Sequence, residues 1–115
     1  MKVYEYPKCS TCVKALKFLD RKKVGYDRVD ITVNPPSKAE LKKMLKVYEG
    51  DLKRLFNTSG VQYRELKIAD RLKGMSEDEA LDLLAGNGRL VKRPFVLTGA
   101  SGVVGFKEDE WKRLF

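Results

Sequence analysis

Strand-forming patterns occur only near the two ends of this chain, and the long stretch between them has the pattern of helices. Residues 2–6, KVYEY, alternate apolar and polar side chains, as half-buried strands do, and residues 26–31 also indicate a strand. Apolar side chains at helical spacing lie between these two segments. The first 31 residues therefore predict a strand, a helix and a strand, and strands joined in this way are expected to pair in parallel.

The middle of the chain, residues 35–86, contains signals for helices. The segment NPP at residues 34–36 ends the preceding element, because proline restricts the backbone and cannot donate a hydrogen bond. Two capping boxes, SKAE at residues 37–40 and SEDE at residues 76–79, each predict the start of a helix. Helices are expected over residues 37–50, 52–56, 61–68 and 76–86.

The last part of the chain predicts two strands and a helix. RPFVLT at residues 93–98 and VVGF at residues 103–106 indicate a hairpin with a short loop of small residues. The final helix has acidic side chains in its first turn and basic ones near its end, as the helix dipole favours. Trp111, Leu114 and Phe115 are expected to pack this helix onto the sheet.

The order of elements predicts the fold class. When the helical middle is set aside, strand–helix–strand is followed by strand–strand–helix, which is the order in a thioredoxin-like fold. We therefore predict an α/β protein with a mixed four-stranded sheet flanked by helices and an inserted all-helical subdomain. Its 115 residues are expected to form a single domain over residues 1–115.

The two cysteines of the chain occur in YPKCSTC, residues 6–12, where the first strand gives way to the first helix. A C-x-x-C pair beside a strand–helix–strand unit is a recognised redox signal. Cys12 falls on the apolar stripe of the helix with Leu16 and Leu19, whereas Cys9 is expected at the exposed helix N-terminus. The two thiols are therefore expected to lie in different environments.

The helix N-terminus favours a thiolate at Cys9. The unpaired backbone N–H groups of the first turn and the helix dipole lower the pKa of a thiol there, and Lys8 adds positive charge. The N–H groups of Ser10, Thr11 and Cys12 are also placed to hold an oxyanion against this sulfur. We predict that Cys9 is the attacking thiolate and that Cys12 is the resolving thiol that closes a Cys9–Cys12 disulfide.

Other interpretations stay open from the residues alone. Cys12 can be a small core residue with Cys9 as a helix cap, since buried free cysteines are common. Two thiolates are half of a tetrahedral zinc shell and the chain has no histidine, so we expect no metal site. The lack of histidine also excludes Cys-His and Ser-His catalysis.

The net charge is +8, and residues 1–55 hold 14 of the 24 basic side chains but 7 of the 16 acidic ones. A basic half can attract nucleic acid, an acidic partner or a small oxyanion. Most of these lysines lie between apolar positions at helical spacing, as on solvated helix faces, so no direct nucleic-acid binding is expected. Without a signal sequence or an apolar run of ~18 residues, we expect a cytoplasmic monomer that does not enter a membrane.

Four segments spread over essentially the whole chain are informative together: YPKCSTC, NTSGVQYREL, LVKRPFVL and VVGFKEDEW. As a set they resemble the arsenate reductase/Spx/MgsR family of thioredoxin-fold proteins. The resemblance implies a helical insert at about residues 34–88 and a cis Pro94 that faces the cysteine loop. It also places Arg93 beside the nucleophile.

The same resemblance implies a thiol-dependent oxidoreductase with Cys9 as its nucleophile. In the reductases this cysteine attacks arsenate and then exchanges with a thiol, so glutathione, glutaredoxin or thioredoxin would donate electrons, and no cofactor would be bound. Arg93 would orient the anion. In the Spx branch the cysteine pair is a redox switch and the protein binds the RNA polymerase α subunit, which makes a redox-sensing regulator the alternative.

Two positions depart from the family's pattern. Its glutaredoxin-coupled reductases surround the nucleophile with three arginines, of which Arg93 matches one, while Asn57 and Phe106 stand at the other two. Those reductases also usually lack a cysteine at the place of Cys12. Arginine forks bind tetrahedral oxyanions bidentately, whereas a lysine such as Lys92 offers only a point charge. We therefore expect arsenate to bind weakly and the thiol chemistry to be intact.

Overall fold

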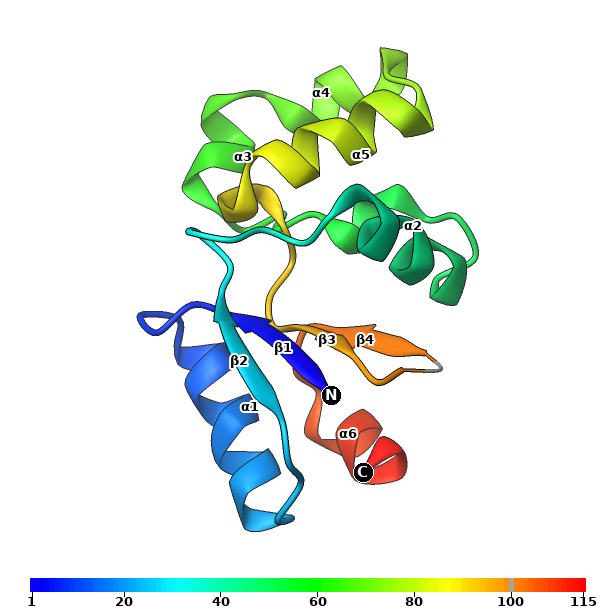
Figure 1. Cartoon of the computed structure of the whole chain (residues 1–115). Helices are drawn as coiled ribbons and strands as arrows, with labels where there is room; N and C mark the ends of the chain where they lie inside the picture. Colours follow the sequence, from blue (N-terminus) through cyan, green and yellow to red (C-terminus); the bar gives the residue numbers. More distant parts are fainter. Residues whose placement is uncertain (100) are drawn as a thin grey trace.

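The computed structural model, which describes residues 1–99 and 101–115, contains a mixed four-stranded sheet of order β2–β1–β3–β4 (Figure 1). Strand β1 pairs with β2 in parallel and with β3 antiparallel, and β3 and β4 form an antiparallel hairpin. The predicted sheet is therefore confirmed. The predicted hairpin loop includes Ala100, which lies outside the described residues. The strands are β1 (Lys2–Glu5), β2 (Asp27–Asp30), β3 (Phe95–Leu97) and β4 (Gly102–Val104).

The two faces of the sheet carry different apolar clusters, because successive side chains of a strand point to opposite sides. Val3 lies opposite Val96, and Val96 lies opposite Val103, so these three side chains share one face. They pack against α1 (Ser10–Arg21) and α6 (Glu108–Leu114), which lie on that side of the sheet in Figure 1. The cluster on the other face includes Tyr4, Phe95, Leu97 and Val104.

The chain between β2 and β3 forms helices that cover this second face (Figure 1). Both predicted capping boxes are present: Ser37 Oγ accepts the Glu40 N–H at 3.2 Å, and Ser76 Oγ accepts the Glu79 N–H at 3.1 Å. We refer to residues 38–90 as the helical insert. Its elements are α2 (Lys38–Val47), η1 (Leu52–Leu55), α3 (Val61–Glu65), α4 (Ile68–Arg71), η2 (Leu72–Gly74), α5 (Glu77–Gly86) and η3 (Gly88–Leu90).

The single helix predicted over residues 61–68 is wrong, because the chain forms two short helices there. Helix α3 ends at Glu65, and α4 begins at Ile68. Between them Lys67 has a φ of 53°, in the left-handed region, which interrupts a right-handed helical backbone.

The C-terminal helix packs on the sheet through Trp111 and Phe115. Trp111 is buried, its indole N–H donates to the Gly105 carbonyl at 3.1 Å, and its ring centroid lies 5.3 Å from that of Phe115. The prediction for Leu114 is wrong, since 53% of this residue is exposed. Trp111 and Phe115 are four residues apart and share one side of the helix, whereas Leu114 lies beside that side.

The return of the chain from the helical insert to the sheet is fixed by backbone pairing. Val91 forms an isolated antiparallel bridge with Phe56, and the Lys92 N–H donates to the Leu55 carbonyl at 2.8 Å. On the neighbouring strand, the Val104 N–H donates to the Tyr48 hydroxyl at 2.9 Å. These contacts tie η1 and α2 to the segment that leads into β3 and to the end of β4.

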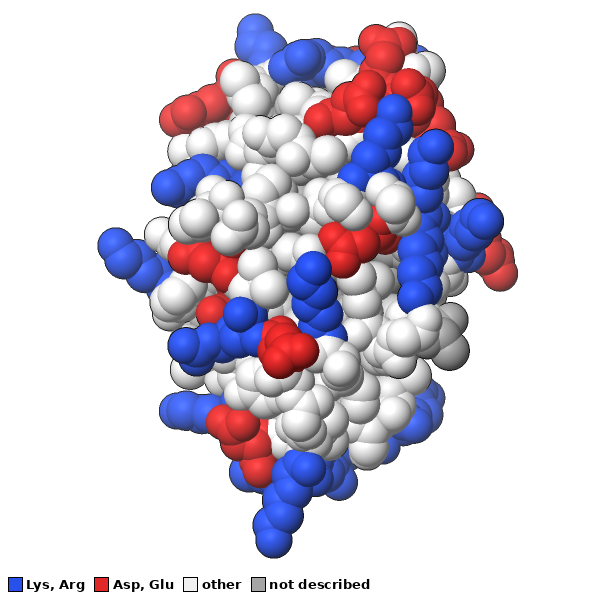
Figure 2. Space-filling view, viewed as in Figure 1, with Lys and Arg blue, Asp and Glu red and all other residues white. Residues whose placement is uncertain are grey.

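The basic side chains are distributed over the face in Figure 2 and are interspersed with acidic ones. This distribution matches the expectation that they occupy solvated helix faces. No helix within residues 1–99 and 101–115 has the length and apolar character needed to cross a membrane. In the same part of the chain, no three His, Cys, Asp or Glu side chains gather as a metal site would require.

Candidate active site

A tight turn joins β1 to α1 and places Cys9 at the first position before the helix. The Cys9 N–H donates to the Tyr6 carbonyl at 3.0 Å, which closes the turn over Pro7 and Lys8. Cys9 is the N-cap residue of α1, with extended backbone angles, and its carbonyl accepts the Val13 N–H at 3.0 Å. The strand, the turn and the helix therefore hold the Cys9 backbone in one position.

The two cysteines are both free thiols, and they differ in exposure. Cys12 is 0% exposed, as its place on the apolar stripe of α1 predicts, whereas Cys9 is half-buried and accessible. This asymmetry is what a pair with one attacking and one resolving thiol requires.

The surroundings of Cys9 favour its thiolate. Partial burial acts to raise the pKa of the Cys9 thiol, but a backbone hydrogen bond from Cys12, the Cys12 thiol and the Arg93 guanidinium act in the opposite direction. The pKa of Cys9 is therefore lowered from its ordinary value. Hydrogen bonds and positive charge stabilise the charged form of a thiol in this way.

The surroundings of Cys12 favour its neutral form. Burial is the largest cause, and it raises the pKa of the Cys12 thiol to about 12, against a backbone hydrogen bond from Tyr6 that lowers the pKa. The negative charges of Cys9 and Glu5 add to the rise. At neutral pH, Cys12 is consequently a thiol and not a thiolate.

The Arg93 side chain reaches Cys9 from the segment that leads into β3. The Arg93–Pro94 peptide bond is cis, as the resemblance implied, and the Pro94 carbonyl accepts the Gly105 N–H at 2.9 Å. The Arg93 guanidinium stacks over the Tyr6 ring at 5.1 Å, which directs this half-buried side chain toward Cys9. Arg93 thus contributes a hydrogen bond and positive charge at the Cys9 sulfur.

The structure brings together some of the residues that the sequence suggested and leaves others apart. Cys9 interacts with both Cys12 and Arg93. The side chains of Lys8, Ser10 and Thr11 are exposed, and of these three Thr11 lines the neighbouring cleft.

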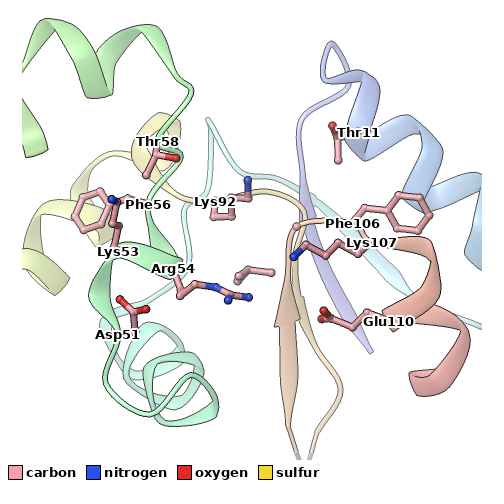
Figure 3. Close-up of a pocket in the computed structure, with 12 residues that line it drawn as sticks. Thr11, Asp51, Lys53, Arg54, Phe56, Thr58, Lys92, Phe106, Lys107 and Glu110 are labelled. Atoms are coloured by element: carbon pink, nitrogen blue, oxygen red, sulfur yellow. The ribbon is translucent and has the colours of Figure 1, made fainter.

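A cleft of about 510 Å³ opens next to this site, between the helical insert and the ends of β3 and β4 (Figure 3). Thr11 and Lys92, which are near Cys9 and Arg93 in sequence, form part of its wall. The lining side chains include four basic and two acidic groups, so the cleft favours an anionic ligand. These charged residues are Lys53, Arg54, Lys92, Lys107, Asp51 and Glu110.

Arg54 is a lining residue that the sequence analysis missed. Its guanidinium stacks over the Tyr48 ring at 4.6 Å, and the Tyr48 hydroxyl is fixed by the Val104 N–H. In Figure 3, Arg54 and Lys107 extend into the cleft from opposite walls. The sequence did place Arg54 just before NTSGVQYREL, the segment that begins at Asn57. The position of the Arg54 side chain in the cleft depends on contacts between distant segments, which that segment alone does not show.

The positions expected to hold two further arginines serve the fold in this chain. The Asn57 N–H donates to the Leu90 carbonyl at 2.7 Å, and the Asn57 side chain lies over Gly60. The Phe106 ring packs against Phe18 and Trp111, with centroid distances of 5.8 and 4.9 Å. Arg93 is consequently the family arginine that is retained beside Cys9.

The sequence model of the ArsC family matches residues 4–114. The chain belongs to the ArsC family. One ArsC relative, the uncharacterized protein YusI of Bacillus subtilis strain 168, is 49% identical over 109 residues, which are 95% of this chain and 92% of YusI. The global transcriptional regulator Spx of Streptococcus mutans is 30% identical over 104 residues, 90% of this chain and 74% of Spx.

Solved structures confirm the thioredoxin-like fold of this ArsC protein. The crystal structure of a possible arsenate reductase from Streptococcus mutans UA159 superposes with a TM-score of 0.90 at 41% identity. The match covers 99% of this chain and 97% of the other. ArsC family proteins similar to this chain thus include both a possible reductase and transcriptional regulators.

Proposed function

We propose that this ArsC protein is a thiol–disulfide oxidoreductase in which Cys9 attacks and Cys12 resolves. The observation that supports this most directly is the pairing of an accessible Cys9, whose pKa is lowered, with a fully buried Cys12 on the same helix. The alternative is that Cys12 is only a core residue and Cys9 only a helix cap. That alternative gives no reason for the Arg93 guanidinium beside Cys9 or for the tight turn that holds it.

The reaction has two exchanges. The Cys9 thiolate attacks one sulfur of a disulfide, a Cys9–substrate mixed disulfide forms, and the first substrate sulfur leaves as a thiolate. Cys12 then loses its proton and attacks the Cys9 sulfur, and the second substrate sulfur leaves. The substrate disulfide is reduced to two thiols, while Cys9 and Cys12 are oxidised to a disulfide. Glutathione, glutaredoxin or thioredoxin would regenerate the two thiols, with no bound cofactor.

A disulfide suits this site better than arsenate. An arsenate ion carries its charge on a small tetrahedral group that several guanidinium forks bind well. In this chain Asn57 and Phe106 are engaged in the fold and Arg93 remains, whereas the cleft of about 510 Å³ has the size of a small-molecule or peptide site. We infer that the anionic part of a larger disulfide substrate lies in this cleft, near Arg54.

The pH dependence of Cys9 alkylation tests the proposed function. Iodoacetamide reacts with the thiolate, so the rate rises with pH and levels off above the pKa of Cys9. We expect the midpoint below the value of about 8.5 for a free thiol. Arg93→Met is expected to shift this midpoint upward, because the guanidinium that lowers the pKa of Cys9 is lost.

Arg64→Met provides the matched control. It removes the same charged group from an exposed position on α3, and the midpoint should stay at the wild-type pH. A wild-type midpoint at the free-thiol value, together with no response to Arg93→Met, would contradict the proposed role of Cys9.

A redox-sensing regulator is the second candidate function, and the 30% identity to Spx of Streptococcus mutans favours it. In this case the Cys9–Cys12 disulfide would change a surface that binds the RNA polymerase α subunit. Pull-down of the purified α C-terminal domain with the reduced and the oxidised chain tests this candidate. A regulator should bind in a redox-dependent way, and the absence of binding in both states would remove the candidate.

A further inference from the structure

The cleft beside the cysteine site contains basic side chains that no acidic side chain neutralises. Arg54 extends into it from η1, and Lys107 extends into it from the opposite wall, at the start of α6 (Figure 3). Within residues 1–99 and 101–115, neither of these groups forms an ion pair, and neither does Lys92. Like charges that face each other across a cleft repel, and an anion between them removes this repulsion. The cleft is therefore arranged for a ligand with negative charge.

Contacts within the fold hold the Arg54 guanidinium in place without a ligand. The guanidinium stacks over the Tyr48 ring, 4.6 Å from the ring centroid. The Tyr48 hydroxyl accepts the Val104 N–H at 2.9 Å, which ties the end of α2 to the end of β4. The Arg54 N–H donates to the Asp51 carbonyl at 3.1 Å. A guanidinium held in this way loses little conformational freedom when it binds a carboxylate.

Lys92 connects the cleft to the nucleophile. Its side chain lines the cleft and passes close to Gly105, where an added β-carbon would lie 3.1 Å from Lys92 Cε. The next residue, Arg93, reaches the Cys9 sulfur. On the other side of the nucleophile, Thr11 follows Cys9 by two residues and also lines the cleft. A ligand in the cleft is consequently adjacent to the attacking thiol.

The exposure of the basic groups favours a polypeptide over a small molecule as the ligand. Arg54 and Lys107 are exposed, and Lys92 is half-buried. Sites for small molecules enclose about 70–90% of the ligand surface. A cleft whose charged walls stay open to solvent instead suits a segment of chain that enters and leaves it. Arg54 belongs to the helical insert, so this recognition is separate from the sheet and helices of the thioredoxin-like core.

We propose that the substrate is a polypeptide with acidic residues beside its disulfide, and that Arg54 is the residue that selects it. The inference rests on the proposed function, because it names the disulfide that Cys9 attacks. The acidic side chains would lie between Arg54 and Lys107 while the substrate disulfide faces Cys9. The Cys9 sulfur then bonds to one substrate sulfur, the substrate S–S bond breaks, and the other substrate sulfur leaves as a thiolate.

Two short peptides, each joined into a homodimer by its own disulfide, test this selection. The acidic peptide has glutamates on both sides of its cysteine, and the neutral peptide has glutamines there. The full-length reduced chain is mixed with each homodimer at about 0.15 M salt, and the rate constant for release of peptide thiol is measured by chromatography. Each rate constant is divided by that of 2-mercaptoethanol with the same homodimer, which corrects for the intrinsic reactivity of the two disulfides.

The wild-type chain should react about tenfold faster with the acidic homodimer than with the neutral one. Arg54→Met should reduce this ratio to about threefold, because Lys107 remains, and Arg54→Glu should abolish the preference. A change in the acidity of Cys9 would alter both rate constants alike, so the ratio reports recognition.

Arg71→Met is the matched control. It removes the same charged group from an exposed position at the end of α4, outside the lining of the cleft. Charges more than about 8 Å apart are largely screened at this ionic strength, so the ratio should stay at the wild-type value.

The inference is overturned if the wild-type chain reduces both homodimers equally well, or if the preference persists in Arg54→Glu. A chain that reacts with 2-hydroxyethyl disulfide but with neither homodimer also overturns it. Glutathione disulfide is the third probe. If it reacts faster than the acidic homodimer and Arg54→Met slows it, the cleft holds a small molecule and the assignment to a polypeptide is wrong. A wild-type chain that reacts with none of these disulfides would instead contradict the proposed function.

Discussion

Cys9→Ser is expected to reduce the reaction with a small disulfide to the rate seen in protein-free solution. A serine hydroxyl at this position has no adjacent histidine to activate it, because the chain contains none. Cys12 cannot take over, since it is fully buried and its pKa is raised to about 12. Intact mass after mixing with 2-hydroxyethyl disulfide should therefore show unmodified Cys9→Ser protein.

Cys12→Ser is the complementary variant. Its Cys9 remains accessible beside Arg93, so one equivalent of adduct should form and persist, since no second thiol can resolve it. The wild-type chain should instead lose two hydrogens as the internal disulfide closes. An adduct that forms on Cys9→Ser at the wild-type rate would show that the roles of the two cysteines are reversed.

Gly88→Ala should destabilise the protein by about 3 kcal/mol, which lowers the Tm by about 12 °C for a domain of this size. A β-carbon at Gly88 would lie 1.7 Å from the Ile31 carbonyl oxygen and 3.3 Å from Pro35 Cβ. The obstacle is backbone, so it cannot move aside as a flexible side chain would. The segment that enters the helical insert and the last element of the insert touch at this position, and both would have to shift.

Gly86→Ala is the control for this prediction. Gly86 ends α5, and a β-carbon there would meet nothing within 4 Å. Alanine is a better helix residue than glycine, so the Tm should stay the same or rise slightly. Thermal unfolding followed by circular dichroism measures both variants. Equal midpoints for Gly88→Ala and the wild type would mean that the segments at Ile31 and Gly88 are not closely packed in solution.

Local patterns in the sequence were sufficient to predict most of the elements. The alternation in residues 2–6, the two capping boxes and the apolar stripe through Cys12 each depend on neighbours within a few residues. The same patterns could not show that Lys67 has a positive φ and divides one predicted helix into two. Nor could they show that Leu114 lies outside the face that Trp111 and Phe115 bury.

The candidate site was predictable where its parts are close in sequence. YPKCSTC contains the turn, the helix start and both thiols, so their different environments follow from one segment. Arg54 depends on a contact between separate segments, since its guanidinium is held over the Tyr48 ring and the Tyr48 hydroxyl is bound to β4. Its position comes from tertiary packing, which residue spacing does not encode.

The backbone pairing between η1 and the segment before Arg93 connects the helical insert to the ionisation of the Cys9 thiol. The Lys92 N–H donates a hydrogen bond to the Leu55 carbonyl, so the residue that precedes Arg93 is tied to the helical insert. A molecule that displaces the insert would thereby move the guanidinium relative to Cys9 and change how readily the thiol ionises. By reciprocity, ionisation or oxidation of Cys9 would alter the affinity of the insert for that molecule. Ionisation of the Cys9 thiol and binding of a molecule to the helical insert would thus be thermodynamically coupled.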